Sequence, residues 1–129
     1  SRASYPKQLL KLVSDRSLLQ ETAMRGFADV GFAAPVVVCN ADHRFLVSDQ
    51  LEEVGVRPQG LLLEPLARNT GPAIAVAALW LLRRDPDALM LVQPSDHVIA
   101  SLPEFHAAVM RGTAAAREGR LVTFGVRPD

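Results

Sequence analysis

Four short runs rich in Val and Leu, without regular polar alternation, constrain the fold of this chain more than any other feature. They occupy residues 36–39, 61–64, 89–92 and 121–126. Strands that are apolar on both faces are typical of parallel sheets, because helices cover both sides of such sheets. The sequence therefore predicts four buried strands.

The segments between these runs carry apolar residues at helical spacing and helix-boundary signals. The first predicted helix is opened by Ser17 and Gln20 and continues through Leu19, Ala23 and Phe27, and the second covers 42–54, with Val47, Leu51 and Val54 on one face and Gly55 as its stop. The third runs from Pro72 to Arg84 and is ended by Asp85-Pro86-Asp87. The fourth runs from Ser101 to Gly119, with Pro103 and Glu104 in its first turn. Strands alternating with helices predict an α/β fold in one domain, with a doubly wound, mostly parallel, Rossmann-like sheet.

Charge and composition exclude several classes of protein. The 129 residues include 14 basic and 14 acidic side chains, and no basic run stands out, so nothing indicates a nucleic-acid partner. The apolar stretches are shorter than the roughly 20 residues that span a bilayer. The single cysteine, Cys39, excludes a disulfide framework. We expect a soluble cytoplasmic protein with no membrane partner.

Parallel α/β sheets bind ligands outside the carboxyl ends of their strands. Polar residues follow three of the predicted strands, in the segments Asn40-Ala41-Asp42, Glu64-Pro65 through Thr70, and Gln93-Pro94-Ser95-Asp96-His97. We expect these segments to gather at one edge of the sheet.

The segment after Glu64 leads through a polar loop into the helix at Pro72. A helix N-terminus offers unpaired N–H groups and a partial positive charge, which suit a phosphate or the carbonyl of a purine. Asn69 and Thr70 add hydrogen-bonding groups beside it. In the alternative interpretation, Asn69 and Thr70 cap the helix and Arg68 pairs with Glu64. The residues alone leave both open.

Asp96, in Pro94-Ser95-Asp96-His97, follows the most apolar of the predicted strands. Its carboxylate could hold Mg²⁺, a hard cation that takes one or two carboxylates together with substrate phosphates. Equally, Asp96 could cap a turn. Adjacent Ser95, Asp96 and His97 do not form a hydrolase triad, whose members are brought together in space rather than in sequence. No second ligand at suitable spacing supports His97 as a metal ligand.

Lys7 follows Pro6 in the polar segment Arg2-Ala3-Ser4-Tyr5-Pro6-Lys7-Gln8. Its ammonium group could place a point charge on phosphates. Exposed lysines are common, however, and the segment alone does not separate a binding lysine from an ordinary surface residue.

Taken together, these segments resemble one family in the order in which they occur. The matching stretches are Ser4-Tyr5-Pro6-Lys7-Gln8-Leu9-Leu10, Ser17-Leu18-Leu19-Gln20-Glu21-Thr22, Glu64-Pro65 with Arg68-Asn69-Thr70-Gly71-Pro72-Ala73-Ile74-Ala75, Pro94-Ser95-Asp96-His97-Val98-Ile99, and Phe124-Gly125-Val126 with Pro128. They are similar to mannose-1-phosphate guanylyltransferases, in the long bacterial form that is often fused to a phosphomannose isomerase. The resemblance covers essentially the whole chain.

The resemblance implies that GTP and mannose 1-phosphate react to give GDP-mannose and pyrophosphate, mainly through positioning and neutralisation of phosphate charge. It implies that Lys7 and Asp96 are catalytic and that Asp96 binds Mg²⁺. The nucleotide-binding positions that it implies are Arg2, Lys7, Glu64, Arg68, Asn69, Thr70 and Pro94.

The family pattern also contains a strand and a glycine-rich phosphate loop before the position of Ser1, and a sugar-binding half after Asp129. We therefore expect residues 1–129 to be a partial nucleotidyltransferase domain whose sheet lacks a central strand, normally placed between the strands at 36–39 and 89–92. We expect no guanylyltransferase activity from the 129 residues alone, and self-association that completes the sheet is one hypothesis.

Other activities are compatible with parts of this pattern. A nucleotidyltransferase that uses UTP, dTTP or ATP is one alternative, and a non-catalytic regulatory domain of the same fold is another. The second fits less well, because Lys7 and Asp96 are both present. A dinucleotide-binding dehydrogenase lacks support, since no Gly-x-Gly-x-x-Gly turn follows any predicted strand.

Overall fold

The computed structural model describes residues 7–11, 15–25, 31–64, 70–95, 99 and 101–124. Its elements in chain order are η2 (Lys7–Leu9), α1 (Leu18–Met24), β1 (Val36–Asn40), η4 (Ala41–His43), α2 (Arg44–Glu53), β2 (Gly60–Glu64), α3 (Thr70–Arg84) and α4 (Leu102–Arg117). They fall into two compact units, of which the first contains η2 through α3 and the second contains α4.

β1 and β2 form a parallel pair, with Val36 opposite Gly60 and Asn40 opposite Glu64. The crossover that a parallel pair requires is supplied by η4 and α2. The predicted strands at 36–39 and 61–64 are therefore confirmed, each longer by one residue. Both are partly rather than fully buried.

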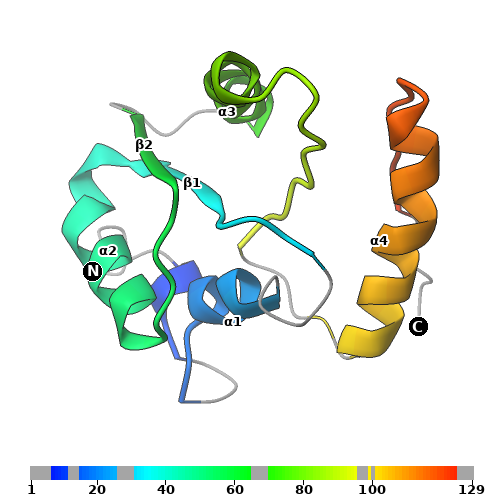
Figure 1. Cartoon of the computed structure of the whole chain (residues 1–129). Coiled ribbons are helices and arrows are strands. Elements are labelled where there is room, and N and C mark those ends of the chain that lie inside the picture. The colour runs from blue at the N-terminus through cyan, green and yellow to red at the C-terminus, as the bar shows by residue number, and fades with distance from the viewer. Residues whose placement is uncertain are drawn as a thin grey trace. The chain divides into compact units, whose positions relative to one another are not determined.

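Helices lie on both sides of this strand pair, with α1 and α2 on one side and α3 on the other (Figure 1). The buried core is on the α1–α2 side and consists of Leu9, Leu19, Val47, Leu51 and Val56. Val37 and Cys39 of β1 and Leu61 of β2 pack against it, as expected for alternate residues that share one face of a sheet. This arrangement confirms a mixed α/β fold with helices on both faces of a parallel sheet.

Local signals correctly placed the start of α1 and the stop of α2, whereas α1 ends at Met24 and α2 begins at Arg44, two residues later than predicted. The hydroxyl Oγ of Ser17 accepts a hydrogen bond from the backbone N–H of Gln20 at 3.1 Å, and Ser17 N–H donates to Gln20 Oε1 at 2.9 Å, which is the predicted capping box. After α2, Gly55 has φ +74°, in the left-handed region that glycine adopts without strain. Phe27, expected on the first helix, lies outside the described residues.

α3 begins at Thr70, two residues earlier than predicted. The prediction placed Pro72 at the first helical position, whereas Pro72 lies within the first turn. The N–H groups of a first turn have no acceptor inside the helix, so proline costs no hydrogen bond there. The predicted stop is confirmed, because Asp85 Oδ1 accepts a hydrogen bond from Asp87 N–H at 3.0 Å just after the helix.

The predictions of strands at 89–92 and 121–126 are wrong for the residues that the structure describes. Neither 89–92 nor 121–124 is a strand, and residues 125 and 126 lie outside the described ranges. Leu89 and Val92 are 43% and 44% exposed. An apolar run becomes a strand only where a neighbouring strand pairs with its N–H and C=O groups, and neither segment has such a partner among the described residues.

The second unit is built around α4. Ser101 Oγ accepts a hydrogen bond from Glu104 N–H at 3.3 Å, which confirms the predicted helix start, and Gly119 follows the helix with φ +87°. The chain then returns along α4, because Val122 and Phe124 lie close to Gly112. None of the helices in the described ranges combines the length and the apolar character of a bilayer-spanning segment.

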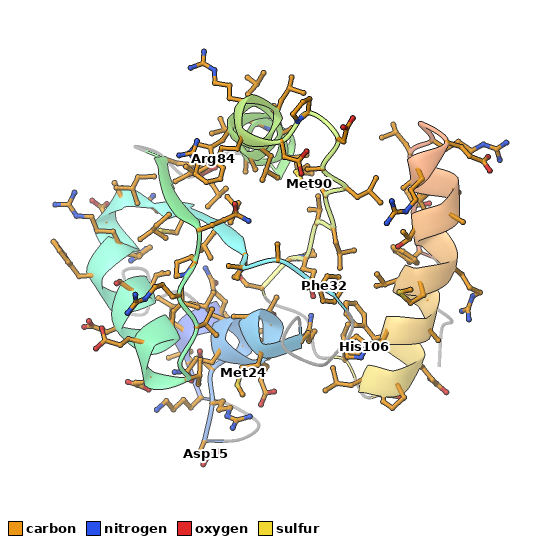
Figure 2. All side chains as sticks on the ribbon, viewed as in Figure 1. Asp15, Met24, Phe32, Arg84, Met90 and His106 are labelled. Atoms are coloured by element: carbon orange, nitrogen blue, oxygen red, sulfur yellow. The ribbon has the colours of Figure 1, made fainter. Side chains whose placement is uncertain are left out.

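The packing of α3 on the strands depends on the absence of a side chain at Gly60. A Cβ atom at that position would lie 2.7 Å from Cζ2 of Trp80, closer than van der Waals contact allows. The guanidinium of Arg84, labelled in Figure 2, lies over the same indole ring at 3.7 Å from its centroid. A side chain at position 60 would therefore have to displace the indole ring from its contact with Arg84.

We therefore expect Gly60→Ala to lower the free energy of unfolding by about 1–3 kcal/mol, the usual cost of an overpacked contact. Urea denaturation followed by circular dichroism measures the change. Gly71→Ala, in the first turn of α3, is the matched control, because a Cβ there meets nothing within 4 Å. Equal stabilities of the two variants would contradict the prediction.

Candidate functional site

The carboxyl ends of β1 and β2 bring two of the predicted polar segments together. Asn40 and Glu64, the last residues of the two strands, are directly opposite each other in the parallel register. This confirms the expectation that the segments beginning at Asn40 and Glu64 share one edge of the sheet. Glu64 is partly buried there.

Asn40 has a structural role at this edge. Its Oδ1 accepts a hydrogen bond from the backbone N–H of Asp42 at 2.8 Å and so caps η4. Glu64, by contrast, influences its neighbour Cys39. Burial raises the pKa of the Cys39 thiol, and the negative charge of Glu64 raises it further, which disfavours the thiolate form.

Residues 65–69 connect Glu64, the end of β2, to the helix start at Thr70. Residues 65–69, among them Arg68 and Asn69, lie outside the described residues, as does the side chain of Thr70. Helix capping and ligand binding by these side chains therefore both stay predictions. The 15-residue helix α3 starts six residues after this strand end, two residues earlier than predicted.

Lys7 is exposed and is the first residue of η2. The turn is closed by a hydrogen bond from Leu10 N–H to the Lys7 carbonyl at 3.0 Å. Leu9, the last residue of η2, is part of the buried core. The turn is thus anchored by an apolar side chain, while Lys7 is exposed.

The third predicted segment is described as far as Ser95. Pro94 is exposed, and Asp96 and His97 lie outside the described residues, as does Arg2 at the other end of the chain. Gln93, the residue before Pro94, accepts a hydrogen bond at its Oε1 from Nη1 of Arg25 at 3.4 Å. This contact joins the segment that leads to Asp96 to the C-terminal end of α1.

Arg25 is a residue of this region that the sequence interpretation missed. Its side chain is only 5% exposed. Burial lowers the pKa of its guanidinium, and the carboxylate of Glu21 partly offsets this effect. A positively charged residue just after a predicted helix gives no local sign that it will be buried, because its partner Gln93 is 68 residues away.

The described ranges contain no group of three or more His, Cys, Asp and Glu side chains that could hold a metal ion. A Mg²⁺ site that combines one carboxylate with substrate phosphates needs no such group. Asp96, the predicted Mg²⁺ ligand, lies outside the described residues, so the Mg²⁺ site stays a prediction.

An open depression lies at the other end of β2. It is lined by Ser48, Glu52, Gly55, Val56, Arg57 and Pro58. The last four of these residues precede the first residue of β2, so the depression is remote from Asn40 and Glu64. It contains none of the residues predicted for the site.

Comparison with known proteins identifies the family to which the chain belongs. Residues 1–129 match the model of the family described as nucleotidyl transferase. The chain is 55% identical over 128 residues to xanthan biosynthesis protein XanB of Xanthomonas campestris pv. campestris, with 99% of this chain and 27% of XanB covered. It is 46% identical over 129 residues to a mannose-1-phosphate guanylyltransferase of Escherichia coli, with 100% of this chain and 27% of that protein covered.

The chain is also similar to a solved structure. The crystal structure of mannose-6-phosphate isomerase from Helicobacter pylori superposes with a TM-score of 0.84 and 36% sequence identity, covering 99% of this chain and 48% of that one. The chain thus spans about a quarter of the length of the curated relatives that it matches. From the match over its whole length, the chain belongs to the nucleotidyl transferase family.

Proposed function

We propose that this chain is part of a mannose-1-phosphate guanylyltransferase, which forms GDP-mannose and pyrophosphate from GTP and mannose 1-phosphate. The observation that carries the proposal is the 46% identity, over all 129 residues, to the Escherichia coli protein of that name. The sheet edge formed by Asn40 and Glu64, next to the start of α3, supports it, because such edges are the usual ligand sites of α/β folds.

The proposed reaction is an in-line substitution at phosphorus. A phosphate oxygen of mannose 1-phosphate attacks the α-phosphorus of GTP, the bond from that phosphorus to the bridging oxygen breaks, and pyrophosphate leaves with the electron pair. The protein forms no covalent bond to the substrates. Its contribution is to align the two substrates and to stabilise negative charge on the phosphates.

We assign the roles of individual residues by their places in the family pattern. Lys7 stabilises charge on the phosphates of GTP, and Asp96 holds Mg²⁺, which when bound neutralises further phosphate charge. The remaining positions contact the guanine, the ribose or the phosphates, and they are Arg2, Glu64, Arg68, Asn69, Thr70 and Pro94. The described part of the chain supports this assignment in one respect, since Lys7 is exposed on an anchored turn.

We also propose that residues 1–129 are a partial domain of a longer cytoplasmic protein. The relatives are almost four times as long as the matched region. In the longer protein, an additional strand would pair with an apolar segment such as 89–92, which has no partner among the described residues. Without it, we expect no turnover and a tendency to associate through exposed apolar surface. Light scattering of the 129-residue chain tests this, and a stable monomer would count against association.

The function is tested by assaying the full-length protein with mannose 1-phosphate and each of GTP, UTP, dTTP and ATP. We expect pyrophosphate release with GTP in the presence of Mg²⁺, and GDP-mannose as the product by mass spectrometry. Preference for another nucleotide would replace the guanylyl assignment with a different sugar-phosphate nucleotidyl transfer. The absence of turnover with all four would favour a non-catalytic domain of the same fold.

A further inference from the structure

We propose that Gln50, a buried residue of α2, positions the turn that carries Lys7. This inference rests on the proposed function, because it deepens the role given there to Lys7. Gln50 is not one of the predicted ligand-binding residues, and it is a positioning residue rather than a catalytic one. It acts through the backbone of η2.

The side chain of Gln50 joins α2 to η2 by a direct hydrogen bond. Its Nε2 donates to the backbone carbonyl of Leu9 at 2.9 Å, across 41 residues of sequence. Leu9 is the last residue of η2, which starts at Lys7. The last carbonyl of a short helical turn receives no hydrogen bond from an N–H group of the same turn. Gln50 supplies its partner.

The amide of Gln50 is itself held from α1. Its Oε1 accepts a hydrogen bond from the Ser17 hydroxyl at 2.6 Å, and its backbone carbonyl accepts one from Gln20 Nε2 at 2.8 Å. Ser17 and Gln20 are in turn locked to each other by the capping box of α1. The amide group of Gln50 can therefore present only its nitrogen to Leu9, since its oxygen is already used.

The whole cluster is shielded from water. Ser17, Gln20 and Gln50 are 0%, 1% and 4% exposed. Directional hydrogen bonds are strong in such surroundings, and an unmet polar group there is costly, so the cluster admits one arrangement. The apolar contact of Leu9 with the core holds η2 down but does not fix its rotation, because hydrophobic contact is non-directional. The bond from Gln50 sets the direction in which Lys7 projects.

Gln50→Leu removes the donor while keeping a side chain of similar size. Gln59→Leu is the control, because Gln59 Nε2 also donates to a backbone carbonyl, that of Ala34 at 2.6 Å, but at an exposed position and with no bond to η2. In the full-length protein, we expect Gln50→Leu, and not Gln59→Leu, to speed the hydrogen exchange of the Leu10 amide, which donates to the Lys7 carbonyl. Amide hydrogen exchange is measured at a temperature where both variants are folded.

The kinetic test uses the full-length protein and a double-mutant cycle with Lys7→Ala. We expect Gln50→Leu to lower kcat/KM for GTP by about 10- to 100-fold, since small displacements of a positioning group have effects of that size. In the Lys7→Ala background, the same substitution should lower it by no more than about twofold, because there is no longer a lysine to misplace. Gln59→Leu should leave kcat/KM unchanged in both backgrounds.

The outcomes separate this inference from the proposed function. An equal loss from Gln50→Leu in both backgrounds would show a general effect on folding and would overturn the inference, even if the enzyme is a guanylyltransferase. If the full-length protein has no nucleotidyltransferase activity, the exchange measurement decides alone. Faster exchange at Leu10 then supports the positioning of the Lys7 turn, and unchanged exchange overturns it.

Discussion

Replacing Asp96 with Asn should lower the guanylyl transfer rate of the full-length protein by about a hundredfold or more, while leaving the protein folded. Asparagine has nearly the same size and still offers a side-chain oxygen, so it can cap a turn as aspartate does. It lacks the negative charge that Mg²⁺ prefers in its ligands. The substitution thus separates the two roles that the residue type permits. Initial rates measured over a range of Mg²⁺ concentrations should show a weakened dependence on the metal.

Asp85→Asn is the control for this experiment. Asp85 follows α3, and its Oδ1 accepts a hydrogen bond from Asp87 N–H at 3.0 Å, which is the turn-capping role in isolation. We expect this variant to keep its activity, since asparagine can accept the same bond. If Asp96→Asn also turned over at close to the original rate, Asp96 would be a turn cap and no metal ligand.

Lys7→Ala should reduce kcat/KM for GTP by about 10²- to 10³-fold, the usual loss when a group that stabilises developing charge is removed. The stability should change little, because Lys7 is exposed and the turn is anchored instead by Leu9. Steady-state kinetics together with a thermal melt measure both quantities in the same samples. An enzyme with a lowered kcat/KM and an unchanged melting temperature is the expected result.

Lys11→Ala provides the comparison. Lys11 is another exposed lysine four residues along the chain, and its Nζ lies 3.6 Å from Oε1 of Glu53 in an exposed ion pair. Such pairs contribute little to stability, and Lys11 has no predicted contact with the nucleotide. Unchanged kinetics in both variants would make Lys7 an ordinary surface lysine.

The parts of the fold that the sequence predicted well are those fixed by neighbouring residues. Ser17 and Gln20 form their capping box within one helical turn, and Gly55 ends α2 because its own backbone adopts a positive φ. Val47 and Leu51 are buried on one face of α2, as their spacing of four residues indicated. In each case the cause lies within a few residues of the effect.

The parts that were missed depend on residues far apart in the sequence. Residues 89–92 have the composition of a buried strand, but a strand also needs a paired neighbour, which composition does not supply. Gln50 looks like a solvent-facing residue next to Leu51, yet its partners Ser17 and Leu9 are 33 and 41 residues away. No local pattern marks a glutamine as the centre of a buried network.

The candidate site shows the same division. The meeting of Asn40 and Glu64 followed from parallel pairing, because the carboxyl ends of parallel strands share an edge. The contact between Arg25 and Gln93 could not be foreseen, since it joins a helix end to a segment 68 residues later. Identifying Lys7 and Asp96 depended on the family resemblance, because one exposed lysine and one aspartate after a strand are common in proteins of any kind.

The contacts of Trp80 with Gly60 and Arg84 have a practical consequence. Trp80 is the single tryptophan of the chain, and it belongs to the first compact unit, whereas the unit built on α4 has none. Its fluorescence is therefore an intrinsic reporter of whether α3 is docked on β2. Circular dichroism at 222 nm records the helices of both units, so comparing the two melting curves shows whether the helices melt together with the undocking of α3 from β2.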